Sequence, residues 1–238
     1  MIPNSETAQP SVPNNPPNFD GLARAYRWME YFSFGMMLER CRFRHLQECG
    51  ESRRALILGD GDGRFTARLL ATNTALYAEA IDCSPAMLAQ LERTVKRIDS
   101  RISPELSSAE TRLRTICADI RDFSPPGNGY DLIVSHFFLD CLTRSEMEAL
   151  MKRILPKLSP HSKWIVSEFA IPGKGWQRRP AQLLVSGLYF AFRQLTHLQV
   201  KQLPEYATVF SRYGFRCTRN SRALWGLLSA EVWERNAL

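Results

Sequence analysis

The residues with the clearest capacity for chemistry form a short loop rich in glycine and acid, Gly59-Asp60-Gly61-Asp62-Gly63. Glycines let a backbone turn sharply and approach a ligand where a Cβ atom would collide. An apolar run, residues 55–58, precedes the loop, and Phe65, Leu69 and Leu70 follow it at helical spacing. A strand, a glycine turn and a helix in this order are typical of nucleotide-binding α/β proteins.

The spacing and charge of this loop favour a cationic ligand over a dinucleotide. The glycines follow the pattern G-x-G-x-G, and the dinucleotide fingerprint would need a third glycine where Arg64 stands. Two carboxylates, Asp60 and Asp62, would repel a pyrophosphate, which the N-terminus of a helix otherwise attracts. S-adenosylmethionine (SAM) carries a sulfonium, an ammonium and no phosphate, so it fits such a loop. Asp60 is the candidate partner of its ammonium. The alternative is an acidic turn of an α/β protein with no ligand role.

Length and composition predict one α/β domain with additions. The chain has 238 residues, of which 45% are hydrophobic, so a full core is available. Residues 1–18 are rich in Pro, Asn and Ser, and we expect them to be a disordered tail outside the domain of residues 19–238. This start lacks the pattern of a signal peptide, which predicts a cytoplasmic protein.

The cysteines and the charge exclude some classes of site. The six cysteines form no C-x-x-C pair, which predicts reduced thiols and no zinc site, and we expect no metal. The net charge of +7 favours encounters with acidic partners such as anionic lipid, but no nucleic-acid-binding motif is present. The sequence does not indicate an oligomeric state.

Apolar patterning predicts alternating strands and helices. Apolar runs predict strands at residues 55–58, 75–81, 113–117, 130–135, 163–169, 214–219 and 225–233, with a turn at residues 160–162. Helical spacing predicts helices from Arg64, from Pro85 after a capping Ser84, over 145–158 and over 205–213. Strands that alternate with helices predict a parallel sheet with helices on both faces, and the last two strands would form a hairpin at its edge.

Two further segments are expected to cover the ligand. Residues 19–50 are aromatic-rich and predict an N-terminal helical cover over the ligand, or alternatively helices that only cover an edge of the sheet. Residues 172–203 form an insertion with an apolar stripe at helical spacing, which includes Leu184, Leu188 and Leu195. It predicts a lid over an apolar acceptor, and its Trp176 and basic residues would touch an anionic membrane surface. The alternative is a helix that packs on the core.

Five segments in order resemble the motifs of the class I SAM-dependent methyltransferases, over about residues 20–235. They are LILGDGDG, AIDCSPAMLAQ, CADI, YDLIVSHFFLDCL and KLSPHSKWIVSEF. The resemblance implies a Rossmann-like three-layer α/β sandwich, with a mostly parallel seven-stranded sheet that ends in an antiparallel hairpin. It implies methyl transfer from SAM to a small molecule, which the lid predicts to be apolar. A weaker similarity is to the quinone-biosynthesis C-methyltransferases.

The resemblance also implies roles for single residues. Ligands of such sheets lie outside the carboxyl ends of the strands. The cofactor-binding set is Gly59, Asp60, Gly61, Gly63, Asp82, Cys83, Met87, Asp119, Ile120 and Ser135. In that set Asp82 would accept from both ribose hydroxyls, and Cys83 and Met87 would pack near the adenine. Asp119 would accept from the adenine amino group, and Ile120 would cover the ring. Near the transferred methyl, His136 is the candidate general base and Asp140 the second candidate.

The sequence departs from the family at two positions. An acid is usual at the position of Ile57, so its role is expected to pass to Asp60 or Asp62. Pro160-His161-Ser162 replaces a Pro-Gly-Gly turn. The alternative functions are an NAD-dependent oxidoreductase, which the acidic loop and Arg64 disfavour, and a non-catalytic SAM-binding protein, which Ile57 leaves open.

Overall fold

The structure, a computed structural model, describes residues 35–102, 110–170 and 206–235. Within them seven strands form one sheet in the order β3-β2-β1-β4-β5-β7-β6. The strands are β1 (Arg54–Leu58), β2 (Tyr77–Asp82), β3 (Leu113–Cys117), β4 (Tyr130–His136), β5 (Leu158–Phe169), β6 (Phe215–Ala223) and β7 (Leu228–Arg235). Strands β1 to β5 are parallel, and β7 is antiparallel to both β5 and β6. The predicted fold class is therefore confirmed.

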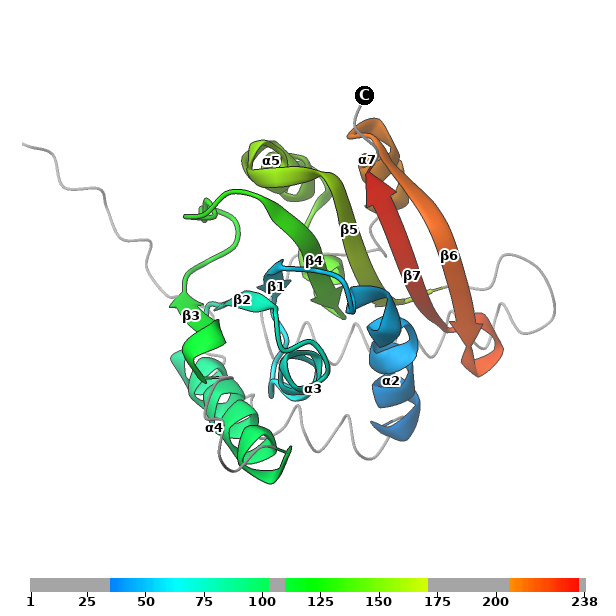
Figure 1. The fold of residues 1–238 in the computed structure, drawn as a ribbon. Coiled ribbons are helices and arrows are strands. Elements are labelled where there is room, and N and C mark those ends of the chain that lie inside the picture. The colour runs from blue at the N-terminus through cyan, green and yellow to red at the C-terminus, as the bar shows by residue number, and fades with distance from the viewer. Residues whose placement is uncertain (1–34, 103–109, 171–205, 236–238) are drawn as a thin grey trace, which may run out of the picture.

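Helices cover both faces of this sheet, as Figure 1 shows. Helices α2 (Gly35–Arg42), α3 (Arg64–Thr72) and α4 (Pro85–Ile102) lie on one face, and α5 (Arg144–Ile154) and α7 (Tyr206–Arg212) lie on the other. The 3-10 helices are η1 (Phe43–Cys49), η2 (Glu110–Arg112), η3 (Leu139–Cys141), η4 (Leu155–Lys157) and η5 (Leu224–Gly226). The arrangement has the three layers that the sequence predicts.

Each face of the sheet has its own apolar core. Trp164 of β5 is fully buried with Phe210 of α7 in the core under α5 and α7, whereas the adjacent Ile165 packs in the core under α3 and α4. Because successive side chains of a strand point to opposite faces, a strand covered on both sides is apolar throughout. This explains the continuous apolar runs in the sequence. Ile57 lies in the second core and is 1% exposed, so a charged side chain at this position would need a buried partner.

Local sequence signals set the starts of two helices at the site. Helix α4 begins at Pro85, and the hydroxyl of Ser84 accepts a hydrogen bond from the Met87 N–H at 3.3 Å. Helix α5 begins after Thr143, whose Oγ1 accepts from the Glu146 N–H while its own N–H donates to Oε2 of Glu146. This reciprocal pair is a capping box, which satisfies N–H groups that have no partner within the helix.

A buried polar cluster joins four strands away from the carboxyl edge of the sheet. Glu79 of β2 is 1% exposed and accepts a hydrogen bond from the hydroxyl of Tyr130, the first residue of β4. Its other contacts are with Arg54 at 3.4 Å and Arg114 at 3.5 Å. Burial and the Glu79 charge raise the pKa of Tyr130 to about 12, so the phenol keeps its proton.

Strand β6 forms one edge of the sheet and is rich in arginine. Arg216, Arg219 and Arg222 are all exposed along it. Its hairpin with β7 turns at Leu224 and Trp225, both of which have left-handed backbone angles, with φ of 51° and 53°.

Some boundary predictions were wrong. Residues 160–162 lie inside β5, which begins at Leu158 and not at Lys163. The pairing of β4 with β5 shifts register between Tyr130 and Leu132, and such a bulge tolerates Pro160 inside a strand. The bounds of the last two strands also differ from the predicted ranges 214–219 and 225–233, and Trp225 belongs to the turn between them. The tail of residues 1–18, the start of the N-terminal cover and the insertion of residues 172–203 lie outside the described residues.

Candidate active site

The loop from Gly59 to Gly63 depends on its glycines. Gly59, Gly61 and Gly63 have φ of 61°, 63° and 76°, which is the left-handed region that side chains disfavour. A Cβ at Gly63 would stand 2.6 Å from Cα of Leu91 in α4. Beside Gly61 the nearest atom to such a Cβ would be the methyl of Met87 at 3.4 Å. The loop therefore runs close against α4 at Gly61 and Gly63, and the ring of Phe138 lies against Gly59.

The two acids of the loop have different surroundings. Asp62 pairs with Arg64, Oδ2 to Nε at 2.8 Å, and Arg64 also contacts Glu39 at 3.3 Å. Asp60 is 5% exposed, and its Oδ2 accepts from the N–H and the hydroxyl of Thr66 at 2.8 and 2.7 Å. Among the described residues its Oδ1 has no hydrogen-bond partner. Burial raises the pKa of Asp60 to about 6, against the opposing effects of Thr66 and the positive Arg42.

The tip of β2 brings three predicted residues together. Asp82 is the last residue of β2, and its Oδ1 accepts from the Ser84 N–H at 2.9 Å. Burial raises the pKa of Asp82. Burial also raises the pKa of the Cys83 thiol to about 11, helped by the negative charges of Asp82 and Asp119. Cys83 thus lies beside both carboxylates, and its thiol stays protonated.

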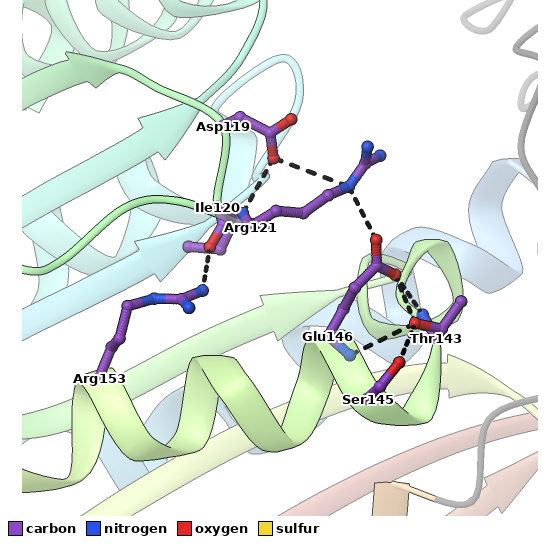
Figure 2. Close-up of polar contacts among 7 residues, drawn as sticks. All are labelled: Asp119, Ile120, Arg121, Thr143, Ser145, Glu146 and Arg153. Atoms are coloured by element: carbon purple, nitrogen blue, oxygen red, sulfur yellow. Dashed lines mark hydrogen bonds and ion pairs between the residues drawn. The ribbon is translucent and has the colours of Figure 1, made fainter. Parts of the chain in front are cut away.

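The turn after β3 carries Asp119 and Ile120, and helix α5 holds it in place (Figure 2). Asp119 accepts from the Arg121 N–H at 2.9 Å, and the Arg121 side chain reaches Asp119 and Glu146 at 3.8 and 3.4 Å. From α5, Arg153 donates Nη2–H to the Ile120 carbonyl and Nε–H to the Phe123 carbonyl, both at 2.9 Å. The conformation of the turn is therefore fixed by side chains that lie 25 to 33 positions later in the chain than the residues they contact.

The tip of β4 places Ser135 and His136 on opposite sides of the sheet. Ser135 is fully buried, and its Oγ accepts from the indole N–H of Trp164 at 2.9 Å. His136 is 3% exposed and stands edge-on to Phe65, with 4.4 Å between ring centroids. Neither ring nitrogen of His136 has a hydrogen-bond partner among the described residues. Burial, together with the positive Arg42, holds the pKa of His136 well below 6.5.

Two residues at this site were missed from the sequence. Arg42, at the end of α2, is 6% exposed and acts electrostatically on both Asp60 and His136. In the sequence it is one of three alternating arginines, which suggested only a basic surface. Glu168, near the end of β5, is 1% exposed and lies beside the β4 tip. The sole sequence signal for Glu168 is an acid at the end of an apolar strand.

The structure thus gathers the predicted residues at one edge of the sheet. Asp60, Asp82, Asp119 and His136 end β1, β2, β3 and β4 or follow them directly, and these strands are parallel neighbours. Asp140 lies in η3 after β4, and a negative charge there acts on the Glu168 carboxyl. Carboxyl edges of this kind are where open α/β sheets bind ligands.

Within the described ranges no three His, Cys, Asp or Glu side chains gather as metal ligands would. No helix in those ranges has the length and apolar character needed to cross a membrane.

Comparison with known proteins finds a similar family over part of the chain. Residues 55–161 match the family described as "Methyltransferase domain", and this range includes the glycine loop and the tips of β1 to β4. This part of the chain is therefore similar to methyltransferase domains. No curated protein matches the sequence.

Solved methyltransferases share the fold. An O-methyltransferase family protein from Burkholderia thailandensis is 13% identical, with a TM-score of 0.66, over 92% of this chain and 59% of that one. Mitomycin 7-O-methyltransferase is 16% identical, with a TM-score of 0.61, over 91% and 60%. An N-methyltransferase from Bradyrhizobium japonicum, solved with S-adenosyl-L-homocysteine (SAH), is 14% identical, with a TM-score of 0.55, over 84% and 88%.

The chain spans 59 to 64% of the length of the first three solved structures that it matches. Identities this low show a common fold, and the atom that accepts a methyl group has to be argued from the site itself.

Proposed function

We propose that this chain is a SAM-dependent methyltransferase that acts on a small, largely apolar molecule. The observation that carries the proposal is the loop of three left-handed glycines beside the Asp82 carboxyl at the tip of the neighbouring strand. Such a loop lets a ligand reach the backbone, and a carboxylate at the next strand tip can accept from two hydroxyls of a ribose. The family match supports this reading over a dinucleotide site.

The buried polar atoms of the site fit SAM. The Oδ1 atom of Asp60 has no partner among the described residues, so a ligand ammonium would supply its missing donor. A cation beside it would also favour the ionised form of a carboxyl whose pKa burial has raised to about 6. Asp62 is already paired with Arg64, which makes Asp60 the better replacement for the acid absent at Ile57. Asp119, Ile120, Cys83 and Met87 remain our proposed contacts of the adenine.

SAM supplies the methyl group and its own leaving group, so the protein has chiefly to align the acceptor in a closed site. His136 is neutral near pH 7, because its pKa lies well below 6.5. It is thus in the correct form for a general base, although a depressed pKa makes it a weak one. Asp140 stays the second candidate.

Binding measurements test the proposal. Isothermal titration is expected to show binding of SAM and SAH but not of NAD. Replacement Asp82→Ala is expected to weaken SAH binding by about 1.5–3 kcal/mol, the range for hydrogen bonds to charged groups. Binding of NAD with no binding of SAM would favour the oxidoreductase alternative. Binding of SAM with no conversion to SAH in the presence of a metabolite extract would favour a non-catalytic protein.

The hydrogen bonds from Arg153 of α5 to the turn after β3 give a second prediction. Replacement Arg153→Met removes both hydrogen bonds that fix the turn after β3, so SAH should bind about tenfold more weakly, or about 1.4 kcal/mol. Lys152→Met is the matched control, because it makes the same change at the adjacent exposed position. A lower melting temperature in Arg153→Met with unchanged SAH affinity would show that the hydrogen bonds of Arg153 only stabilise the fold.

We also propose a cytoplasmic location and a lid formed by residues 172–203. The basic start of that segment is our proposed contact with anionic membranes. Sedimentation with anionic vesicles tests the contact.

A further inference from the structure

Glu168 is held rigidly at the point where β4 and β5 end. The two strands are parallel neighbours, with His136 opposite Ser167, so Glu168 lies next to the turn that follows His136. Its Oε1 atom accepts hydrogen bonds from the N–H groups of Phe138 and Leu139, at 3.0 and 2.8 Å. These two bonds fix the carboxyl group beside the β4 tip.

Three buried glutamates on this sheet can be compared. Glu79, Glu168 and Glu231 are each at most 4% exposed. Both carboxyl oxygens of Glu79 contact donors of Arg54, Tyr130 or Arg114.

Glu231 is likewise satisfied. Its Oε1 accepts from Ser229 and Asn220, and its Oε2 accepts from Tyr206 and Trp233. Glu168 alone of the three has an oxygen, Oε2, with no partner among the described residues. Buried polar groups normally have a partner, and an exception calls for a specific explanation.

The charges around Glu168 do not explain why its Oε2 atom has no partner among the described residues. Burial raises the pKa of Glu168 well above 4.5, and the negative charges of Asp140 and Glu231 raise it further, against the two backbone hydrogen bonds. The two backbone hydrogen bonds account for Oε1 of Glu168, whereas no described group accounts for Oε2.

We propose that Glu168 contacts the methyl acceptor, and that the acceptor carries a hydroxyl group that occupies the place beside Oε2. The inference rests on the proposed function, because only a transferase has an acceptor. It adds a specificity-determining residue to the site and a functional group to the acceptor.

A hydroxyl group suits this carboxyl in either protonation state. Protonated Glu168 donates from Oε2 and needs an acceptor atom, whereas ionised Glu168 needs a donor. A hydroxyl group provides both, while a carbonyl only accepts and an ammonium only donates. An acceptor that bears a hydroxyl group therefore matches the buried Oε2 atom of Glu168.

The test compares small phenols with their methyl ethers on SAH-loaded protein. Binding is followed by ligand-observed NMR, and methyl transfer by radiolabel from SAM. The variant is Glu168→Gln. The control is Ser162→Ala, which removes a buried hydroxyl without a described partner from the opposite end of the same strand. In wild type and Ser162→Ala, phenols should bind better than ethers by about tenfold or more.

In Glu168→Gln this preference should disappear, while SAH affinity stays within about twofold of wild type. An unchanged preference for phenols in Glu168→Gln would overturn the inference. A loss of SAH affinity as large as the loss of phenol affinity would also overturn the inference, because Glu168 would then contribute to cofactor binding. Absence of SAH binding in the wild type would instead count against the proposed function.

Thermal unfolding decides the question if no phenol binds. The pKa of Glu168 is higher in the folded protein than in the unfolded chain, where it is about 4.3. The carboxyl therefore makes its full contribution to folding stability below about pH 4.3, and this contribution is lost as the pH rises through the folded-state pKa. The melting temperature of Glu168→Gln should therefore fall less than that of wild type between about pH 5 and pH 8. At the higher pH the variant should be at least as stable as wild type. A loss of stability as large as that of Glu231→Gln would mean that Glu168 is structural, and would overturn the inference.

Discussion

Replacement of Gly63 by alanine is expected to lower the free energy of unfolding by about 2–5 kcal/mol. A left-handed backbone costs a residue with a Cβ about 1–2 kcal/mol, and an overfilled core costs about 1–3 kcal/mol more. Both penalties apply at Gly63, because its φ is 76° and the new Cβ would stand 2.6 Å from Cα of Leu91. A rotamer change cannot relieve a clash with a backbone atom, so α4 would have to move away from the loop.

The control for this prediction is Gly129→Ala. Gly129 has a similar φ of 73°, but no atom lies within 4 Å of where its Cβ would be. The Gly129→Ala variant should therefore lose only the cost of a left-handed backbone, about 1–2 kcal/mol of the free energy of unfolding. Urea unfolding of both variants gives the difference. Equal losses in the two variants would mean that the contact between Gly63 and α4 is not tight.

Replacement of Glu79 by alanine is expected to cost about 3 kcal/mol. Removal of one partner from a buried charged cluster costs about 3–5 kcal/mol, because the remaining groups lose their compensation. We expect the lower end of that range, since the side chains of Arg54 and Arg114 are 36% and 55% exposed and water can solvate them. The Tyr130 hydroxyl, in contrast, lies in a fully buried residue.

A double-mutant cycle separates the hydroxyl from the rest of the cluster. Tyr130→Phe alone should cost about 1–1.5 kcal/mol. In the background of Glu79→Ala the same change should cost less, because its partner is already absent. Chemical unfolding of the four proteins provides the values. Strict additivity would indicate that Tyr130 and Glu79 do not interact in solution.

Much of the fold could be predicted because its signals are local. The run 55–58 followed by glycines places β1, its loop and α3, and Ser84 with Pro85 places the start of α4. A parallel sheet follows from the alternation of strands and helices. The boundaries of β5 could not be predicted, because Pro160 normally signals a turn and the bulge that accommodates it depends on the partner strand β4.

The candidate site could be predicted only in part. Residues that follow a strand directly, such as Asp82 and Asp119, are placed by the sheet itself, so their position at its carboxyl edge follows from sequence order. The paired state of Asp62 and the capping bond from Thr66 to Asp60 depend on the path of the loop. The unsatisfied oxygen of Glu168 depends on the absence of a donor, and no sequence pattern encodes such an absence.

The arginines of β6 have a consequence for how copies of this molecule meet. An edge strand exposes unpaired N–H and C=O groups, which can pair with an edge strand of another copy and extend the sheet from one molecule to the next. Two β6 strands laid side by side would bring Arg216, Arg219 and Arg222 of one copy close to those of the other. Repulsion among these guanidinium groups would oppose that pairing at low salt, although Glu48 and Glu231 balance part of the charge of Arg219 and Arg222, at 3.1 and 3.9 Å. High ionic strength, which screens this repulsion, is therefore the condition under which the protein should be most prone to aggregate through its sheet edge.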